Sequence, residues 1–413
     1  MSAEIFVQGL KNPTTMAFLG PNDILVLEKD RGTVMRIVNG VILDVPLLDL
    51  NVANRHERGL LGIVIASGDD NSTIDEDRYT GKSGDQLYVY LYFTKGETGD
   101  GEDNGPDDGH KISSNSLYRY VFLKNGNTDS LVNPKLVFEL PPSHHTFHNG
   151  GALLVGPDKN IYLGTGDLSQ PYKSTVQNIR NSSFPSGAGG ILAFTQDGKA
   201  IHGINSGILG DMYPLDKYYA YGIRNIFGMD FDPVSGKLWD TENGPFYGDE
   251  INIVEPGFNS GWSKVQGIWR PTENLTAGES VLNPDELVTF NQRGKYSSPE
   301  FIWKQPVGPT ALKFLNSANL GQEYENDMFV GDINNGFLYH FDLVKNRTIL
   351  DLDDEAGALA DKVANTSSEL TDVIFGQGFG GITDIEVGPY DGYLYVVSHR
   401  HGTIYKIVPL DEE

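Results

Sequence analysis

The sequence predicts an all-β protein, a six-bladed β-propeller in which residues 1–413 form one domain with irregular loop insertions. Glycine (49) and proline (21) are abundant and 11% of the residues are aromatic, a composition typical of many short strands joined by tight turns. No stretch shows sustained helical periodicity. A strand–turn–strand pattern also returns at intervals of tens of residues, as expected of blades that each need neighbours to bury their faces.

The recurring unit is a short strand, a turn with Pro, Asp or Gly, a second apolar strand and a glycine. It is found at residues 24–38, 152–167, 229–244, 327–342 and 385–408, and counting such units gives about six blades. We expect the strand near Glu4–Leu10 to pair with the last blade near Thr403–Val408. Such closure removes exposed sheet edges that would invite aggregation.

Polar insertions separate some of the predicted strands. Residues 67–84 and 95–109 are acidic and flank the strand at 86–94, and residues 272–292 and 351–379 form two further irregular inserts. The second insertion carries four aspartates that lack the spacing of an EF-hand, so a solvated loop is favoured over a calcium site: Asp100, Asp103, Asp107 and Asp108.

Charge and composition exclude several classes of function. Fifty-six acidic against 31 basic residues give a net charge of −25, which repels phosphate backbones and makes nucleic acid an unfavourable partner. The absence of cysteine excludes disulfides, thiolate catalysis and cysteine-ligated metals. No apolar run reaches the roughly 18 residues of a membrane span.

The N-terminal sequence MSAEIFVQGL lacks the charged and apolar regions of a signal peptide. We expect an extracytoplasmic protein, periplasmic or secreted, from which a signal has been removed. An intracellular location fits the same N-terminus.

The stretch from Tyr221 to Trp262 carries the densest set of candidate site residues. Within the segment ENGPFYGDE at 242–250, oxygen-bearing side chains and glycine-flanked carbonyls suit a hard cation such as calcium. Each piece alone is more typical of a turn or a solvated surface. Arg224 precedes a strand and suits either a surface salt bridge or a bidentate grip on a carboxylate-rich ligand.

Three histidines cluster at residues 144, 145 and 148. They form no helical HExxH motif and have no acidic residue among them, so a general base is favoured over a zinc site. His148 is the best candidate because Gly150 and Gly151 follow closely and let a ligand approach the backbone. A histidine packed at the start of a strand is the structural alternative.

Three other residues stand at strand or turn boundaries. Glu57 faces a ligand or pairs with the neighbouring arginines, and Asp167 is a site residue or a turn former. Trp303 belongs to the core or stacks on a flat ligand.

With these motifs in place, the chain resembles the soluble glucose/sorbosone dehydrogenase family, six-bladed propellers that use pyrroloquinoline quinone (PQQ). The resemblance spans nearly the whole length and rests on five segments in family order: ERGLLG at 57–62, HNGGALLVGPDKNIYLGTGD at 148–167, YGIRN at 221–225, ENGPFYGDEIN at 242–252 and GFNSGW at 257–262.

The resemblance implies PQQ- and Ca²⁺-dependent oxidation of an aldose sugar, with an external electron acceptor. By position, His148 matches the catalytic base and Arg224 the arginine near the reactive quinone carbonyl. Gly244 and Pro245 match the carbonyls that hold the catalytic calcium, and Glu250 with the Ser260 carbonyl matches a second, structural calcium. The remaining residues at cofactor-contacting positions are Glu57, Asp167, Asn225, Trp303, Asn334 and Thr383.

The chain departs from the family at three cofactor cations. Asn334 stands where a lysine is expected, and Gly381 and Thr383 stand where two arginines are expected, while Ile223 replaces a histidine. Lys304, Arg400, His399 and His401 are possible substitutes. Two alternatives therefore stay open: an enzyme of this scaffold with another substrate or cofactor, and a non-enzymatic propeller that binds calcium or another ligand.

Overall fold

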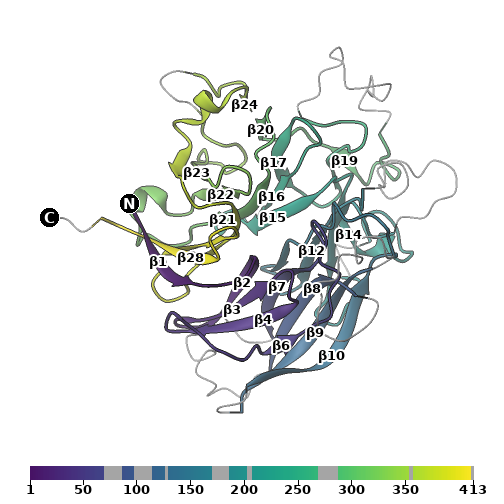
Figure 1. The fold of residues 1–413 in the computed structure, drawn as a ribbon. Coiled ribbons are helices and arrows are strands. Elements are labelled where there is room, and N and C mark those ends of the chain that lie inside the picture. The colour runs from purple at the N-terminus through teal and green to yellow at the C-terminus, as the bar shows by residue number, and fades with distance from the viewer. Residues whose placement is uncertain are drawn as a thin grey trace.

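The computed structural model describes residues 1–68, 86–96, 114–125, 129–169, 186–201, 207–267, 287–352 and 357–410. Within these ranges the chain forms six separate β-sheets and three short 3₁₀ helices, η4 (Leu215–Lys217), η6 (Gln322–Tyr324) and η7 (Ser367–Leu370). The sheets are set around a common centre (Figure 1). The predicted all-β class and propeller-like arrangement are therefore confirmed, and none of the described helices could cross a membrane.

The first three sheets contain strands that lie between residues 13 and 296, and they run outward from the centre. The first contains β2 (Pro13–Gly20), β3 (Asp23–Glu28), β4 (Thr33–Val38), β5 (Val41–Ile42) and β6 (Leu48–Asp49). The second contains β7 (Leu60–Ser67), β8 (Leu87–Thr94), β9 (Asn115–Leu123) and β10 (Ser130–Glu139). The third contains β11 (Leu153–Val155), β12 (Ile161–Thr165), β13 (Gly190–Phe194), β14 (Tyr218–Tyr221), β18 (Phe258–Asn259) and β19 (Lys295–Tyr296).

The other three sheets complete the ring. The fourth contains β15 (Ile226–Phe231), β16 (Leu238–Glu242), β17 (Asp249–Val254), β20 (Phe301–Trp303) and β24 (Val363–Ala364). The fifth contains β21 (Pro309–Phe314), β22 (Met328–Asp332), β23 (Leu338–Phe341) and β25 (Ile374–Gly376). The sixth contains β26 (Ile382–Val387), β27 (Leu394–Ser398), β28 (Thr403–Val408) and β1 (Ser2–Gln8).

The ring closes as the sequence predicts. Strand β1 pairs antiparallel with β28, with Ser2 opposite Val408 and Gln8 opposite Thr403, and Figure 1 shows the two strands side by side. The inner strands β2, β7, β11, β15, β21 and β26 contact one another in that order, and β26 returns to β2. Both terminal strands are thus tied into one sheet.

The predicted strand–turn–strand units are hairpins in the structure. In β15–β16, Phe231 lies opposite Leu238, and the intervening turn ends at Gly236 with φ of +70°, a backbone conformation that glycine adopts without strain. The buried Asp232 carboxylate accepts hydrogen bonds from the turn amide of Val234 and from the Arg347 guanidinium. Apolar clusters fill the spaces between adjacent sheets. Of the predicted insertions, the aspartates at 100–108 lie outside the described residues.

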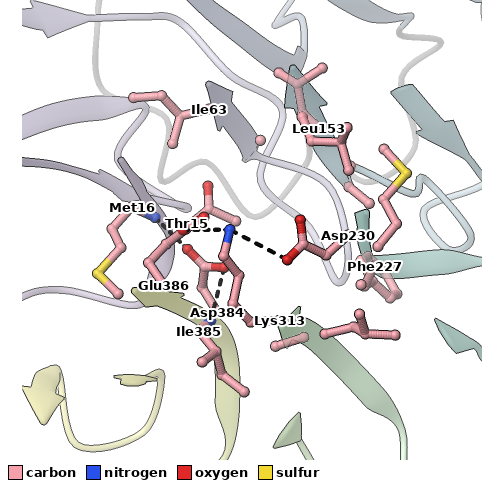
Figure 2. A pocket seen from close by; sticks show the side chains of 18 residues that line it. Thr15, Met16, Ile63, Leu153, Phe227, Asp230, Lys313, Asp384, Ile385 and Glu386 are labelled. Carbon is pink, nitrogen blue, oxygen red and sulfur yellow. Dashed lines mark hydrogen bonds and ion pairs between the residues drawn. The ribbon is translucent and has the colours of Figure 1, made fainter. Parts of the chain in front are cut away.

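The centre of the ring holds a small cavity of about 50 Å³ with a charged half and an apolar half. Lys313 of β21 reaches both neighbouring inner strands, with its Nζ 2.8 Å from Glu386 Oε2 and 3.7 Å from Asp230 Oδ2 (Figure 2). Asp384 joins this cluster and accepts the Met16 amide at 2.8 Å. Burial, together with the charge of Glu386, raises the pKa of Asp384 to about 8.

This cluster predicts a pH dependence of stability. A carboxyl whose pKa is near 4 when unfolded and about 8 when folded binds its proton more tightly in the folded state, so its contribution to stability is lost as pH rises between those values. We expect the unfolding free energy of Asp384→Asn to rise relative to wild type by more than about 1.4 kcal/mol, the equivalent of one pKa unit, between pH 5 and pH 8.

Urea unfolding at pH 5, 6, 7 and 8 measures this difference. Glu323→Gln, at an exposed position, is the control and should follow wild type. A constant difference between Asp384→Asn and wild type across this range would contradict the prediction.

Candidate active site

A cavity of about 250 Å³ opens at the end of the ring where the inner strands β2, β21 and β26 begin. All six sheets contribute to its lining, directly or through the segment that adjoins a strand. The lining residues are Thr14, Thr15, Lys29, His56, Glu57, Leu61, Gly151, Phe227, Asn243, Thr310, Ile333, Thr383 and His399.

His148 lies in the segment before β11, where its amide donates to the lining residue Glu57, and its backbone has a φ of +59°. A Cβ at Gly166 would lie 2.2 Å from the His148 carbonyl oxygen, so glycine is required there. The His148 Nδ1 is 2.6 Å from Asp167 Oδ1, and the Trp262 indole donates to Asp167 Oδ2 at 2.7 Å. When the Nδ1–H group donates to this carboxylate, Nε2 is the acceptor nitrogen of the ring.

Arg224 connects this imidazole to the loop after β16. One terminal nitrogen of its guanidinium is 2.8 Å from His148 Nε2, and the other donates to the Asn243 carbonyl at 2.7 Å. Burial lowers the pKa of Arg224, an effect opposed by the charges of Asp167 and Glu57. The buried Arg224 Nε and Asn243 Oδ1 have no hydrogen-bond partner, and such unpaired atoms fit a polar ligand at this end of the cavity.

Glu57 and Asn225 fix the backbone around His148. Glu57 Oε2 accepts the His148 amide at 2.6 Å and the Asn225 side-chain amide at 3.1 Å, and Asn225 Oδ1 accepts the Gly150 amide at 3.2 Å. The structure thus brings together five residues predicted separately from the sequence: Glu57, His148, Asp167, Arg224 and Asn225.

Asp249 organises the loop that carries Gly244 and Pro245. Its carboxylate accepts the Gly244 amide at 2.7 Å and the amides of Val307 and Gly308 at 2.8 and 2.7 Å. Burial raises the pKa of Asp249 to about 6, although these three donors act to lower it. The carboxylate therefore joins the loop to the segment before β21.

Buried acidic side chains line one face of β16 and β17. Glu242 lies opposite Glu250, and Asp240 lies opposite Asn252, and all four are at most 2% exposed. Glu242 accepts the Arg224 amide and the Ser260 hydroxyl, while Glu250 Oε1 accepts the Gln266 side-chain amide at 2.9 Å.

Burial raises the pKa of Glu242 to about 7 and those of Asp240 and Glu250 well above their usual range. Asp240 Oδ2, Asn252 Oδ1 and Gln266 Oε1 have no hydrogen-bond partner. Buried oxygens without donors, next to three carboxyls, fit an oxygen-coordinated divalent cation. Glu250 and the Ser260 segment, predicted as metal ligands, lie within this group.

The described residues that line the cavity include none of the three expected cofactor cations. Thr383 lines the cavity and donates to the Pro13 carbonyl at 3.2 Å, whereas Asn334 is exposed and donates to the Pro306 carbonyl at 3.4 Å. Neither of the proposed substitutes Lys304 and Arg400 lines the cavity, and their polar heads contact Asn365 and the Asn334 carbonyl.

His399 lines the cavity, but burial lowers its pKa. His401 instead contacts the Tyr405 hydroxyl. Lys29 is a lining cation that sequence reasoning missed, and its ammonium donates to three backbone carbonyls, of Asn54, His56 and Arg58. The sequence feature that could have identified Lys29 as a site residue is its place in the polar turn directly after β3.

Trp303 does not take the position predicted for a stacking residue. It is 1% exposed and packs edge-on against Phe301 within the core of the fourth and fifth sheets. The indole at the site is that of Trp262, which lies 5.5 Å from the Arg224 guanidinium and which sequence reasoning named only as part of a motif. Trp303 follows two apolar residues in the segment FIW at 301–303. Such a segment favours core packing, because the strands of this fold are covered by adjacent sheets.

A further acidic group lies away from this cavity. Asp327, His340 and Asp342 approach within 4.8 Å of one another at β22–β23, with His340 Nε2 3.0 Å from Asp327 Oδ2. A contact between the His340 ring and the Asp342 carboxylate, 3.4 Å from Nε2 to Oδ1, completes this arrangement.

The fold and the site define the class: a propeller-like β-protein with a histidine–aspartate–arginine site at one end of its central axis. The chain belongs to the Glucose / Sorbosone dehydrogenase family, whose model matches residues 10–406. Aldose sugar dehydrogenase YliI of Escherichia coli is 25% identical over 420 residues, covering 99% of this chain and 93% of the relative. Quinoprotein glucose dehydrogenase B of Acinetobacter calcoaceticus is 26% identical over 284 residues, covering 64% and 52%.

Solved structures share the fold over nearly the whole chain. A putative oxidoreductase (glucose dehydrogenase) from Thermus thermophilus superposes with a TM-score of 0.67 at 25% identity, covering 98% of this chain and 99% of that chain. The PQQ-bound aldose sugar dehydrogenase of Streptomyces coelicolor gives 0.66 at 22% identity, covering 98% and 97%.

Proposed function

We propose that this protein is a PQQ- and calcium-dependent oxidoreductase that oxidises aldose sugars and passes electrons to an external acceptor. The observation that carries the proposal is the contact between the His148 Nε2 lone pair and Arg224 beside a cavity that reaches all six sheets. We treat each sheet as one blade of a six-bladed propeller.

His148 is the proposed general base. Asp167 accepts the Nδ1 proton and so fixes the tautomer in which Nε2 accepts the C1 hydroxyl proton of the sugar. The donated Trp262 hydrogen bond and the amide contacts of Glu57 hold this arrangement rigid. Arg224 must share Nε2 with the incoming hydroxyl, which places its guanidinium where negative charge develops on reacting oxygens.

PQQ would supply the quinone that takes the C1 hydride while His148 takes the hydroxyl proton, leaving a lactone. The unpaired Arg224 Nε and Asn243 Oδ1 fit a polar ring edge at this end of the cavity. The other end fits less well, because Ile333 and Thr383 line it and the Lys29 ammonium is already bonded to three carbonyls. We therefore expect PQQ to be held mainly at its quinone end.

Calcium is the second proposed cofactor. The Gly244 and Pro245 carbonyls are the candidate ligands beside PQQ, and Glu250 with the Ser260 carbonyl are the candidates at the structural site. The three unpaired oxygens around Glu250 support the structural site. A cation there would replace protons that burial otherwise favours on Glu242 and Glu250.

Removal of calcium should lower the melting temperature of the wild-type protein. A ligand at a hundredfold excess over its Kd stabilises the native state by about 2.7 kcal/mol, enough for a shift of a few degrees. Glu250→Gln keeps the volume of the side chain and one acceptor oxygen for the Gln266 and Gly267 donors, but removes the charge and the second acceptor oxygen. We expect this variant to lose the part of the calcium response that belongs to the structural site, and to keep only the part that the Gly244 and Pro245 site contributes.

Differential scanning fluorimetry in EGTA and in excess Ca²⁺ tests this. Val234→Ala, at the far end of the β15–β16 hairpin, is the control and should keep the full calcium response. If Glu250→Gln is stabilised by calcium as strongly as wild type, the structural site lies elsewhere.

The absent cofactor cations favour one second candidate, a non-enzymatic calcium-binding propeller. Purified protein supplied with PQQ and Ca²⁺ and tested with a dye and a panel of aldoses separates the two. Dye reduction supports the oxidoreductase, while calcium binding without PQQ binding or dye reduction supports the binding protein. Among locations, a periplasmic or secreted protein remains our proposal.

A further inference from the structure

Two phenylalanines stand exposed beside the candidate active site. Phe246 is 83% exposed, the highest value among the large hydrophobic residues described, and Phe147 is 45% exposed. Exposed apolar residues are ordinary when scattered singly, but two rings next to one catalytic pair call for an explanation.

Both phenylalanines are close in sequence to residues of the His148–Arg224 site. Phe147 directly precedes His148. Phe246 follows Asn243 by three residues, at most about 11 Å of chain, and the Asn243 carbonyl accepts the Arg224 guanidinium. Phe147 also contacts His56, and both His56 and Asn243 line the cavity, so each phenylalanine is next to a lining residue in space or in sequence.

The Phe147 ring and the backbone of the Phe246 loop are also held in place. The Phe147 ring stacks on His56, with centroids 4.4 Å apart and planes inclined by 14°, and the His56 Nδ1 is 2.7 Å from Thr146 Oγ1. The loop of Phe246 is fixed at both ends, since Asp249 accepts the Gly244 amide and the Gly248 amide donates to the Trp303 carbonyl at 3.1 Å. A ring that is fixed before binding, as Phe147 is, loses little entropy when a ligand stacks on it, and a fixed loop lowers the same cost for Phe246.

We propose that Phe147 and Phe246 form an aromatic platform that selects saccharides of two or more rings. This rests on the proposed function: the reducing sugar lies at His148, and the apolar C–H face of the next sugar ring packs on the phenyl rings. A monosaccharide would occupy the site without reaching Phe246. The phenyl side chains offer no hydrogen bonds, so they favour a ring face over charged groups.

The test compares glucose with maltose and cellobiose in dye-linked assays of the full chain with PQQ and Ca²⁺. Phe246→Ala should lower kcat/KM for the disaccharides about fivefold and for glucose less than about twofold. Phe147→Ala should act in the same direction, and Phe246→Trp should preserve the preference. The control is Tyr390→Ala, an exposed aromatic in the β26–β27 turn, remote from His399, which should change neither value.

Binding of maltitol and cellobiitol, which lack the oxidisable C1 hemiacetal, is measured in parallel by calorimetry. Weaker binding to Phe246→Ala supports the platform even if the wild type oxidises no sugar, a result that would count against the proposed function alone. Equal losses for glucose and disaccharides, or no loss, would overturn the platform. A change in oligomeric state with unchanged sugar preference would assign the rings to a contact between copies and would also overturn it.

Discussion

Replacing His148 by alanine is expected to lower dye-linked aldose oxidation by about 10²- to 10⁴-fold at saturating PQQ and calcium. General bases contribute factors of this size when they are positioned on the proton they remove. The expectation follows from the tautomer that Asp167 imposes, which leaves Nε2 as the acceptor at the Arg224 contact. Most of the loss should appear in kcat, because the imidazole acts mainly in the transition state.

Two variants show whether the loss is specific. Asp167→Asn should leave the shape of the cavity unchanged but no longer favour the Nδ1-protonated tautomer of His148. We expect an intermediate loss of activity and a changed pH profile. His340→Ala removes a histidine of β23 that lies away from this cavity, and it should stay within a few-fold of wild type. Activity that survives His148→Ala would remove this residue as the base.

The sequence allowed the fold to be predicted because its signal is local and repeated. Each hairpin, such as β15–β16, carries its own turn residues and apolar alternation, and the ends of the chain show matching strands that close the ring. The grouping of Glu57, His148 and Asn225 followed from motif positions in a known family. No local pattern would have joined them, since Glu57 and Asn225 are 168 residues apart.

Other features depend on packing that a sequence does not show. Lys29 is a cavity residue only because the three carbonyls that hold its ammonium lie beside the first turn. Trp303 is in the core because β17 and β20 pair within a sheet covered by its neighbour. The charged cluster at Lys313 required three inner strands to meet at the axis, and nothing in the individual strands indicates it.

Adding cations to the far end of the cavity should strengthen PQQ binding. Asn334 stands next to the lining residue Ile333, and Thr383 lines the cavity directly, so a longer basic side chain at either position can reach into it. A hydrogen bond to a charged partner contributes about 1.5–3 kcal/mol, which corresponds to a gain of about ten- to hundredfold in affinity for each substitution.

Asn334→Lys, Thr383→Arg and the double variant can be titrated with PQQ in the presence of calcium and followed by absorbance or calorimetry. The double variant should approach the sum of the two free energies, because the carboxylates of PQQ are separate groups.

Asn334→Gln and Thr383→Gln are the matched controls, longer but uncharged, and should leave the Kd within a few-fold of wild type. Since the protein carries a net charge of −25, a general electrostatic gain is also tested, by Glu323→Lys at an exposed position. If this surface variant strengthens binding as much as Thr383→Arg, the gain comes from overall charge, and the cavity does not hold the PQQ carboxylates where its lining suggests.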